Sequence, residues 1–214
     1  GMSDTNPLLQ DWQTPHGLPP FAQLQPEHFE PALFAAMQQH RDELAAIATQ
    51  TAPPSFDNTL ATFDRAGRRL ARVAATFYNL TSSATSPALQ AVQRAMAAPM
   101  AAHHSAVYND ARLFERVAAL HLRSEALELN AEAQRLLDRV HTDFVRAGAR
   151  LAPEAQARHA QVMEDLARLT TGFAQNVLHD ESHGIVALSD EAALAGLPDF
   201  VRAAARQAAS ERGV

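Results

Sequence analysis

The 214-residue sequence has no cysteine and no lysine, so all 18 of its basic residues are arginine. Without cysteine the chain can form no disulfide, no thiolate metal site and no cysteine nucleophile. No stretch approaches the run of about 20 apolar residues that crosses a bilayer. The formal net charge of −6 argues against a surface for nucleic-acid phosphates. Any chemistry must therefore come from other side chains, and neither a Gly-rich phosphate loop nor a G-x-S-x-G motif is found.

The composition is typical of a globular chain that buries a substantial core, with 47% apolar and 20% charged residues. Residues 1–4 lack the basic and apolar regions of a secretory signal peptide, so we expect a cytoplasmic protein. The 12 prolines and eight glycines fall mostly between helical stretches, which fits helices joined by short connectors.

One stretch, residues 53–83, is central to the predicted fold. Two prolines open it, and the following Ser55 and Asp57 are typical of helix N-termini. We expect one continuous helix of about seven turns, which needs other helices to bury its broad apolar stripe. The apolar positions are Phe56, Leu60, Phe63, Leu70, Val73, Phe77 and Leu80.

The residues before this stretch predict an arm and a first helix. Residues 1–25 carry proline and glycine without a period, which indicates an extended arm. Pro31 is tolerated only in a first turn, so the first helix should begin near Glu30. The expected anchors of the arm are Leu8, Leu9, Trp12 and Phe21, and the expected apolar face of the helix is Phe34, Met37, Leu44 and Ile47.

Later helices have recognisable starts. Ser86, Asp110 and Asn130 are N-cap residues before apolar periodic stretches, and Pro153 suits a first turn. Gly148 is placed to end the helix that follows Asn130. A helix from residue 154 to about 178 should bury Val162, Leu166, Leu169, Phe173 and Val177.

The pattern changes near the C-terminus. Residues 185–188 are short, apolar and β-branched, and they form the only strand-like segment; a last helix is expected at 199–211. The predicted fold class is all-α, a bundle-like array of about six to eight helices. We expect an arm at 1–25, a helical domain at 26–183, and at 184–214 the start of a region that continues in a longer polypeptide.

The strongest candidate metal motif is the run His179-Asp180-Glu181-Ser182-His183. Histidines at i and i+4 on a helix can bind zinc, and H-E-x-x-H adds a glutamate as general base. Here Asp180 occupies the glutamate position and Glu181 lies about 100° further around the helix. Gly184 follows, so we expect His183 beyond the helix end, and a solvated helix C-terminus is the favoured interpretation. The downstream glutamates are Glu191 and Glu211, and no strong third ligand presents itself.

Other polar groups receive structural interpretations. His103 and His104 point about 100° apart on one helix and cannot share a metal ion, so we expect one buried and one exposed. His159 is expected at a core edge, on the helix face of Met163. Adjacent carboxylates diverge on a helix and form no acid–base dyad. These pairs are Asp42/Glu43, Glu164/Asp165 and Asp190/Glu191.

Four arginines recur at i, i+3, i+4 and i+7, namely Arg65, Arg68, Arg69 and Arg72. A surface for an anionic ligand is one interpretation, and a solvated helix face paired with neighbouring acids is the favoured one. The residues alone therefore assemble no active site. We assign no catalytic, cofactor-binding or metal-ligating residue in this chain.

Eight segments, in order, resemble the N-terminal region of the thimet-oligopeptidase-like zinc metallopeptidases. The pairing of FDNT at 56–59 with FYNLTSS at 77–83 favours their dipeptidyl carboxypeptidase branch over the oligopeptidase A-like branch. The segments are 6–9 (NPLL), 28–32 (HFEPA), 54–59 (PSFDNT), 77–82 (FYNLTS), 113–117 (LFERV), 143–149 (DFVRAGA), 173–178 (FAQNVL) and 194–198 (LAGLP).

The resemblance implies a mostly helical region that forms one wall of a deep channel, which admits short peptides and excludes folded proteins. Family members carry H-E-x-x-H and a third zinc-ligand glutamate far downstream, and nothing in 1–214 matches these motifs. Zinc is thus implied for the full-length enzyme, and this chain should be inactive alone. Its implied partners are the C-terminal catalytic region and short peptides. Apolar surface left uncovered would favour self-association.

Two alternatives stay open. A stand-alone helical module derived from such a peptidase would bind peptides or proteins without hydrolysis. This hypothesis and that of an N-terminal peptidase region are distinguished by whether the gene continues past Val214 into an H-E-x-x-H. A small zinc hydrolase built on His179 and His183 would need a stoichiometric metal signal that His183→Ala removes.

Overall fold

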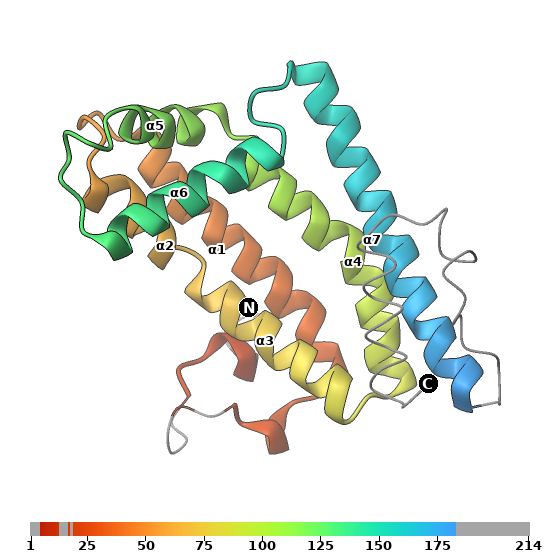
Figure 1. The fold of residues 1–214 in the computed structure, drawn as a ribbon. Helices are drawn as coiled ribbons and strands as arrows, with labels where there is room; N and C mark the ends of the chain where they lie inside the picture. Colours follow the sequence, from red (N-terminus) through yellow and green to blue (C-terminus); the bar gives the residue numbers. More distant parts are fainter. Residues whose placement is uncertain (1–4, 13–16, 18, 183–214) are drawn as a thin grey trace.

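The computed structural model describes residues 5–12, 17 and 19–182, and every regular element in that part of the chain is helical (Figure 1). This confirms the all-α fold class. The strand-like segment expected at 185–188, the helix expected at 199–211 and the whole region 184–214 lie outside the described residues. None of the described helices is long and apolar enough to cross a membrane. The elements are η1 (Pro7–Leu9), η3 (Phe21–Gln23), η4 (Pro26–His28), α1 (Phe29–Thr49), η5 (Phe56–Ala61), α2 (Thr62–Arg65), α3 (Arg68–Ser83), α4 (Pro87–Tyr108), α5 (Ala111–Leu122), α6 (Ala131–Arg146) and α7 (Pro153–Ser182).

Helices α4, α5 and α6 begin at the predicted caps. Ser86 Oγ accepts a hydrogen bond from the backbone N–H of Leu89 (3.1 Å), and Asn130 Oδ1 accepts one from Ala133 (2.8 Å). Asp110 Oδ1 accepts two such bonds at the start of α5. Each bond satisfies an N–H group that has no partner inside its helix, so local chemistry determines these starts.

Helix α6 ends at Arg146, and Gly148 follows at the predicted C′ position. This glycine has φ +101°, in the left-handed region. Its N–H donates to the carbonyl of Val145 (3.0 Å), and the N–H of Ala149 donates to the carbonyl of Phe144 (3.0 Å). These are the two bonds of a Schellman motif, which satisfies the last carbonyls of the helix and lets the chain turn towards α7.

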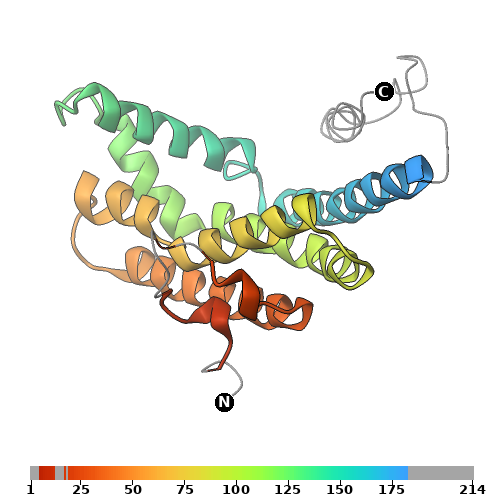
Figure 2. The same ribbon diagram turned by 90° about the horizontal axis from the view of Figure 1, so that it is seen from below.

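The buried side chains form two clusters at opposite ends of α1, whose course beside α3 can be followed in Figure 2. We call the first the arm-side core, between η1, α1, α3 and α4; Phe29 and Phe77 meet there with ring centroids 5.1 Å apart. We call the second the hairpin-side core, between α1, η5, α5 and α6. Phe144 is fully buried in it, 5.7 Å from Phe63 and 4.9 Å from Tyr108 between ring centroids.

Helix α1 contributes to both cores and so joins them. Met37 is buried in the arm-side core, and Leu44 and Ile47 are buried in the hairpin-side core, as predicted. The prediction for Phe34 was wrong, because this ring is 45% exposed. Its neighbour Leu33 points into the arm-side core in its place, so the buried face of α1 is turned by one residue at this point.

The N-terminal arm is held by an arginine of α3. Arg72 Nη2 donates to the carbonyls of Leu8 (3.3 Å) and Gln10 (3.1 Å). Its guanidinium also lies 4.3 Å from the centroid of the Trp12 ring, a cation–π contact. Leu8 is fully buried, which confirms it as an anchor of the arm, whereas Phe21 is 45% exposed and was wrongly expected to be one.

The stretch 53–83 is not one helix, contrary to the prediction. It consists of a π-helix, η5, then the single turn α2, and then α3, with a break at Gly67. Gly67 has φ +77°, and a Cβ placed on it would lie 2.9 Å from Cδ2 and Nε2 of the His40 ring. A side chain fits there neither conformationally nor sterically, so α1 packs against the backbone at the point where the helix stops.

Gly67→Ala is expected to lower the free energy of unfolding by about 2 kcal/mol, because alanine is strained at this φ and its methyl group collides with His40. Urea unfolding measures the change. Gly172→Ala is the matched control: Gly172 lies inside α7 with nothing within 4 Å of a Cβ. There the same substitution should be neutral or stabilise by up to about 1 kcal/mol. Equal effects at the two sites would contradict the explanation.

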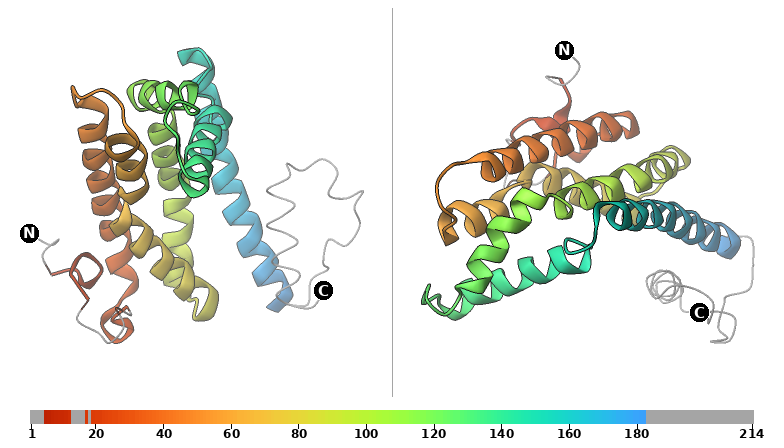
Figure 3. Two further views of the ribbon diagram at one scale, coloured as in Figure 1. Left: turned by 60° about the vertical axis from the view of Figure 1, so that its left-hand side comes forward. Right: turned by 90° about the horizontal axis from the view of Figure 1, so that it is seen from above.

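Helix α7 lies at one edge of the molecule and runs alongside α4 (Figure 3). Leu166, Phe173 and Val177 are partly buried, in line with the prediction. Val162 and Leu169, also expected to point inward, are 52% and 66% exposed. The reason is that α7 packs mainly against one helix, which covers a narrower stripe than a position inside a bundle would.

Candidate functional site

Two cavities adjoin along α4, and they share the side chains of Met100 and His104. The first, which we call the methionine cavity, lies between α3, α4 and α7 and has a volume of about 390 Å³. The second, which we call the histidine cavity, lies between α1, α2, α4 and α6 and has a volume of about 370 Å³. Helix α4 therefore presents an apolar recess and a polar recess side by side.

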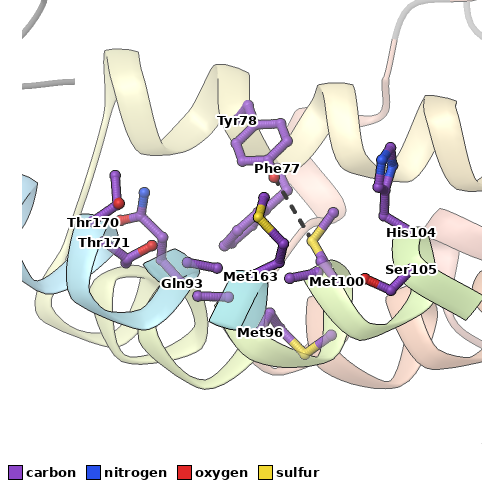
Figure 4. A pocket seen from close by; sticks show the side chains of 13 residues that line it. Phe77, Tyr78, Gln93, Met96, Met100, His104, Ser105, Met163, Thr170 and Thr171 are labelled. Carbon is purple, nitrogen blue, oxygen red and sulfur yellow. Dashed lines mark hydrogen bonds between the residues drawn. The ribbon is translucent and has the colours of Figure 1, made fainter. Parts of the chain in front are cut away.

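The methionine cavity is lined mainly by apolar side chains (Figure 4). Met96 and Met100 come from α4, Met163 comes from α7, and Phe77 comes from α3. Methionine is flexible and polarizable, so such a lining adapts to apolar groups of different shape. The cavity offers no paired acid and base, and it can bind an apolar group without catalysing a reaction on it.

Tyr78 lies at the rim of this cavity and is 49% exposed. Its hydroxyl is 3.7 Å from Sδ of Met100, a weak hydrogen bond drawn in Figure 4. Burial raises the pKa of Tyr78 above its ordinary value, so the phenol stays protonated and acts as a donor near neutral pH. Tyr78 is part of the FYNLTSS segment but could not be assigned to a cavity from the sequence.

One glutamine ties α7 to α4 beside the methionine cavity. Gln175 is 8% exposed, and its Nε2 donates to the carbonyl of Gln90 (3.0 Å) and to Oε1 of Gln93 (2.9 Å). Its Oε1 accepts from Nη1 of Arg94 (2.7 Å). A buried amide with all of these partners fixes the register of the two helices. Sequence reasoning missed Gln175, although it lies in the FAQNVL segment.

The histidine cavity contains a hydrogen-bonded pair of imidazoles. Nδ1 of His40 lies 2.8 Å from Nε2 of His103, and Nη1 of Arg41 lies 3.5 Å from Nδ1 of His103. Burial, helped by the neighbouring His40 and Arg41, lowers the pKa of His103 to about 4, and burial also lowers that of His40. Both rings are therefore neutral near neutral pH.

A second group of the histidine cavity surrounds Tyr108. The rings of His104 and Tyr108 lie 4.6 Å apart between centroids. The neighbouring side chains partly desolvate the His104 ring and so lower its pKa, while the nearby Asp143 raises it in part. Burial and Asp143 both raise the pKa of Tyr108. The prediction of one buried and one exposed residue is confirmed, because His103 is buried and His104 exposed, but the His40 partner was not foreseen.

The structure describes only part of the H-D-E-S-H motif. His179 lies exposed near the end of α7, and His183 lies outside the described residues. Across residues 5–12, 17 and 19–182, no group of three histidine, aspartate or glutamate side chains is arranged to hold a metal ion. His159 is half-buried on α7, in line with the expected core-edge position.

Two of the adjacent carboxylates, Asp42 and Asp165, make hydrogen bonds within their own helices. Asp42 accepts a hydrogen bond from Gln38 (3.0 Å), and Asp165 accepts one from Gln161 (3.1 Å), in each case one turn away on the same helix. Asp165 is also paired with Arg168. None of these contacts joins two carboxylates. The pair Asp190/Glu191 lies outside the described residues.

Among the four arginines at 65–72, Arg72 holds the N-terminal arm and the other three make no ion pair with a described residue. Arg72 binds arm carbonyls and Trp12, which corrects the expectation that it pairs with an acid. Arg65 and Arg68 are exposed and Arg69 is half-buried. None of these three forms an ion pair with another residue that the structure describes. The expected solvated face is thus present, but without the expected acidic partners.

A further histidine pair joins α5 to α6. The rings of His121 and His141 stack face to face, with centroids 3.7 Å apart and an interplanar angle of 1°. Burial and the neighbouring His121 lower the pKa of His141. Nitrogen lone pairs lie in the plane of each ring, so parallel stacked rings direct them side by side and not towards one ion. The pair therefore does not fit a shared metal.

Comparison with known proteins gives a consistent set of relatives, although no family model matches the chain. It is 35% identical over 213 residues to the dipeptidyl carboxypeptidase of Escherichia coli K12, covering 100% of this chain and 31% of that protein. It is 36% identical over 210 residues to the Salmonella typhimurium dipeptidyl carboxypeptidase, covering 98% and 31%. Oligopeptidase A of Escherichia coli K12 is 28% identical over 208 residues, covering 97% and 30%. The chain thus spans about three tenths of the length of these relatives.

Proposed function

We propose that this chain, which corresponds to the N-terminal region of thimet-oligopeptidase-like peptidases, forms a helical wall of the peptide channel in an enzyme resembling dipeptidyl carboxypeptidase. Its role there is steric: the wall limits substrates to short peptides. The observation that carries the proposal is the match to dipeptidyl carboxypeptidase over the whole chain at 35% identity.

The zinc and the catalytic residues are proposed to belong to the other part of such an enzyme. The described residues do not fit a zinc site, because the stacked His121–His141 pair does not direct its lone pairs towards one ion and no set of three ligands converges. We therefore derive no catalytic step from this chain and expect residues 1–214 alone to be inactive. The cytoplasmic location also stays a prediction.

The proposed partner is the C-terminal catalytic region of the same polypeptide. Val162 and Leu169 of α7 are 52% and 66% exposed, so the outer face of α7 offers apolar side chains for it to cover. Without that partner the same face would favour self-association of the chain. Short peptides are the proposed second ligand, in the channel that the two regions would share.

A chimera tests this function. In it the matching N-terminal third of the Escherichia coli dipeptidyl carboxypeptidase is replaced by residues 1–214. We expect the chimera to hydrolyse short peptides in a zinc-dependent way and to leave folded proteins intact, and we expect residues 1–214 alone to show no hydrolysis. A soluble, folded chimera without peptidase activity, or zinc-dependent activity of the isolated chain, would contradict the proposal.

The second candidate is a stand-alone helical module that binds peptides or proteins without hydrolysis. The methionine cavity favours it, since it is a largely apolar recess of about 390 Å³ with an adaptable lining. Isothermal calorimetry with apolar peptides distinguishes the two. Binding by the isolated chain together with an inactive chimera would favour the module, and no binding together with an active chimera would exclude it.

A further inference from the structure

The hydrogen-bond donors determine how protons are placed in the Arg41–His103–His40 chain. Arginine can only donate, so Nδ1 of His103, which faces Nη1 of Arg41, must carry a lone pair. The proton of His103 then lies on Nε2 and is donated to Nδ1 of His40 across 2.8 Å. His40 in turn keeps its own proton on Nε2. Both rings are fixed as neutral Nε2–H tautomers.

The far edge of the His40 ring lies against the break between α2 and α3. A Cβ placed on Gly67 would lie 2.9 Å from Nε2 and Cδ2 of His40, so the ring packs directly on the glycine backbone. The donor chain thus runs from Arg41 on α1, through His103 on α4, to the only left-handed residue between η5 and the end of α3. Its geometry connects three elements that are distant in sequence.

Several charged groups face this chain from the elements packed around it. Glu43 raises the pKa of His40, whereas Arg41 lowers it; His104 and Arg41 lower the pKa of His103. From the other walls of the cavity, α2 and α6 add two carboxylates and one guanidinium. The full set is Arg41 and Glu43 (α1), Asp64 (α2), His104 and Tyr108 (α4), and Arg139 and Asp143 (α6).

We propose that Arg41, His103 and His40 form an acid-sensitive latch that holds the Gly67 break between α2 and α3 in place. A proton added to either ring breaks one of the two bonds. If His103 gains it on Nδ1, two donors face each other and Arg41 must leave. If His40 gains it on Nδ1, His103 must accept through Nε2 and move its own proton to Nδ1, with the same result. In both cases the Arg41–His103 bond is lost while the His103–His40 bond remains, so the ring pair that packs on Gly67 is released from Arg41 and carries a positive charge beside it. The latch is independent of the proposed peptidase role.

The lowered pKa of His103 determines how the stability of the folded chain depends on pH. His103 has a pKa of about 4 in the folded chain, against an ordinary value of 6.5 in the unfolded chain. Neutral His103 makes its full contribution to the stability of the folded chain above about pH 6.5. This contribution is lost as the pH falls from there towards 4. The latch is therefore closed at neutral pH, and in the folded protein it opens only near pH 4, where His103 gains its proton.

Nitrogen-15 NMR of the 214-residue chain tests the latch. At pH 8 we expect both imidazoles to give the signals of Nε2–H tautomers. As the pH is lowered towards 4, the amide signal of Gly67 should shift with the same midpoint as His103. An Nδ1–H tautomer of His103 at pH 8 would overturn the proposal. So would a Gly67 amide that stays unchanged while the two rings titrate.

Arg41 variants separate the latch from a purely structural contact. In Arg41→Gln the neighbouring guanidinium is gone, so the midpoint of His103 should rise by roughly half a pH unit or more. Arg41→Lys keeps a cationic donor and should retain the wild-type midpoint. Identical midpoints in the two variants would overturn the role of Arg41. If Arg41→Gln fails to fold, the wild-type tautomers and the Gly67 titration still decide the question.

Discussion

Arg116→Ala is expected to lower the free energy of unfolding by about 3 kcal/mol or more. Arg116 lies on α5 and is only 8% exposed. Its Nε donates to Oγ1 of Thr59 (3.2 Å), Nη1 to the carbonyl of Ala52 (3.0 Å) and Nη2 to Oδ1 of Asn58 (3.1 Å). Alanine would leave these three acceptors without the guanidinium and a cavity beside η5.

The three bonds explain why this arginine matters more than an exposed one. Its acceptors all belong to the segment that starts η5, where Ser55 and Asn58 also form a reciprocal capping box. A buried charged donor that is bonded to three neutral acceptors is costly to remove, above all because the buried Thr59 Oγ1 loses its donor; Asn58 Oδ1 keeps the N–H of Ser55. The FDNT segment and the FERV segment of the sequence meet at this point.

Urea unfolding of three variants measures the effect. Arg112→Ala is the matched control, because Arg112 lies on the same helix and is exposed; we expect a change within about 0.5 kcal/mol. Arg116→Lys keeps the charge but cannot reach three acceptors, so its loss should be intermediate. A loss for Arg116→Ala no larger than that for Arg112→Ala would show that the bonds contribute nothing net.

Helix starts could be predicted because the groups that determine them are close in sequence. Ser86, Asp110 and Asn130 each bind an N–H two or three residues onward, so a window of a few residues contains the whole interaction. The Schellman end of α6 is local in the same way. The all-α class follows from these signals together with the apolar spacing.

The break at Gly67 could not be predicted because its cause lies on another helix. A glycine inside a helical pattern costs only about 1 kcal/mol, and the stretch 53–83 keeps its apolar spacing on both sides of it. The ring that packs on the glycine belongs to His40, 27 positions earlier in the chain. Periodicity shows which face of a helix is buried, but not which residue of a distant helix it meets.

The candidate site was missed for the same reason. His40 and His103 are 63 positions apart, and Gln175 and Gln90 are 85 apart. The sequence presents each as an isolated polar residue on a helix, for which a solvated or core-edge position is the simplest interpretation. Only tertiary contacts turn them into a neutral imidazole pair and a clamp between α4 and α7. For Val162 and Leu169 the error has the opposite sense: they were predicted to be buried and are exposed. The sequence does not reveal how many helices surround α7.

Phe144→Ala is expected to destabilise the chain by about 4 kcal/mol, because it removes a fully buried ring at the centre of the hairpin-side core. The ring lies 5.7 Å from Phe63, 4.9 Å from Tyr108 and 5.8 Å from Phe114 between centroids, so three elements lose contacts at once. Phe34→Ala is the control for the same truncation at a ring that is 45% exposed, and its loss should stay below about 1 kcal/mol.

The same variant shows whether the two cores unfold together. Trp12, the single tryptophan, packs against the arm-side core and so reports on the core that Phe144 does not contact. Because α1 is buried in both cores, we expect Trp12 fluorescence and far-ultraviolet circular dichroism to give the same, lowered urea midpoint in Phe144→Ala. A fluorescence midpoint that stays at the wild-type value while the dichroism midpoint falls would mean that α1 does not couple the cores. In that case the histidine cavity, built on the hairpin side, would be lost while the arm remained docked.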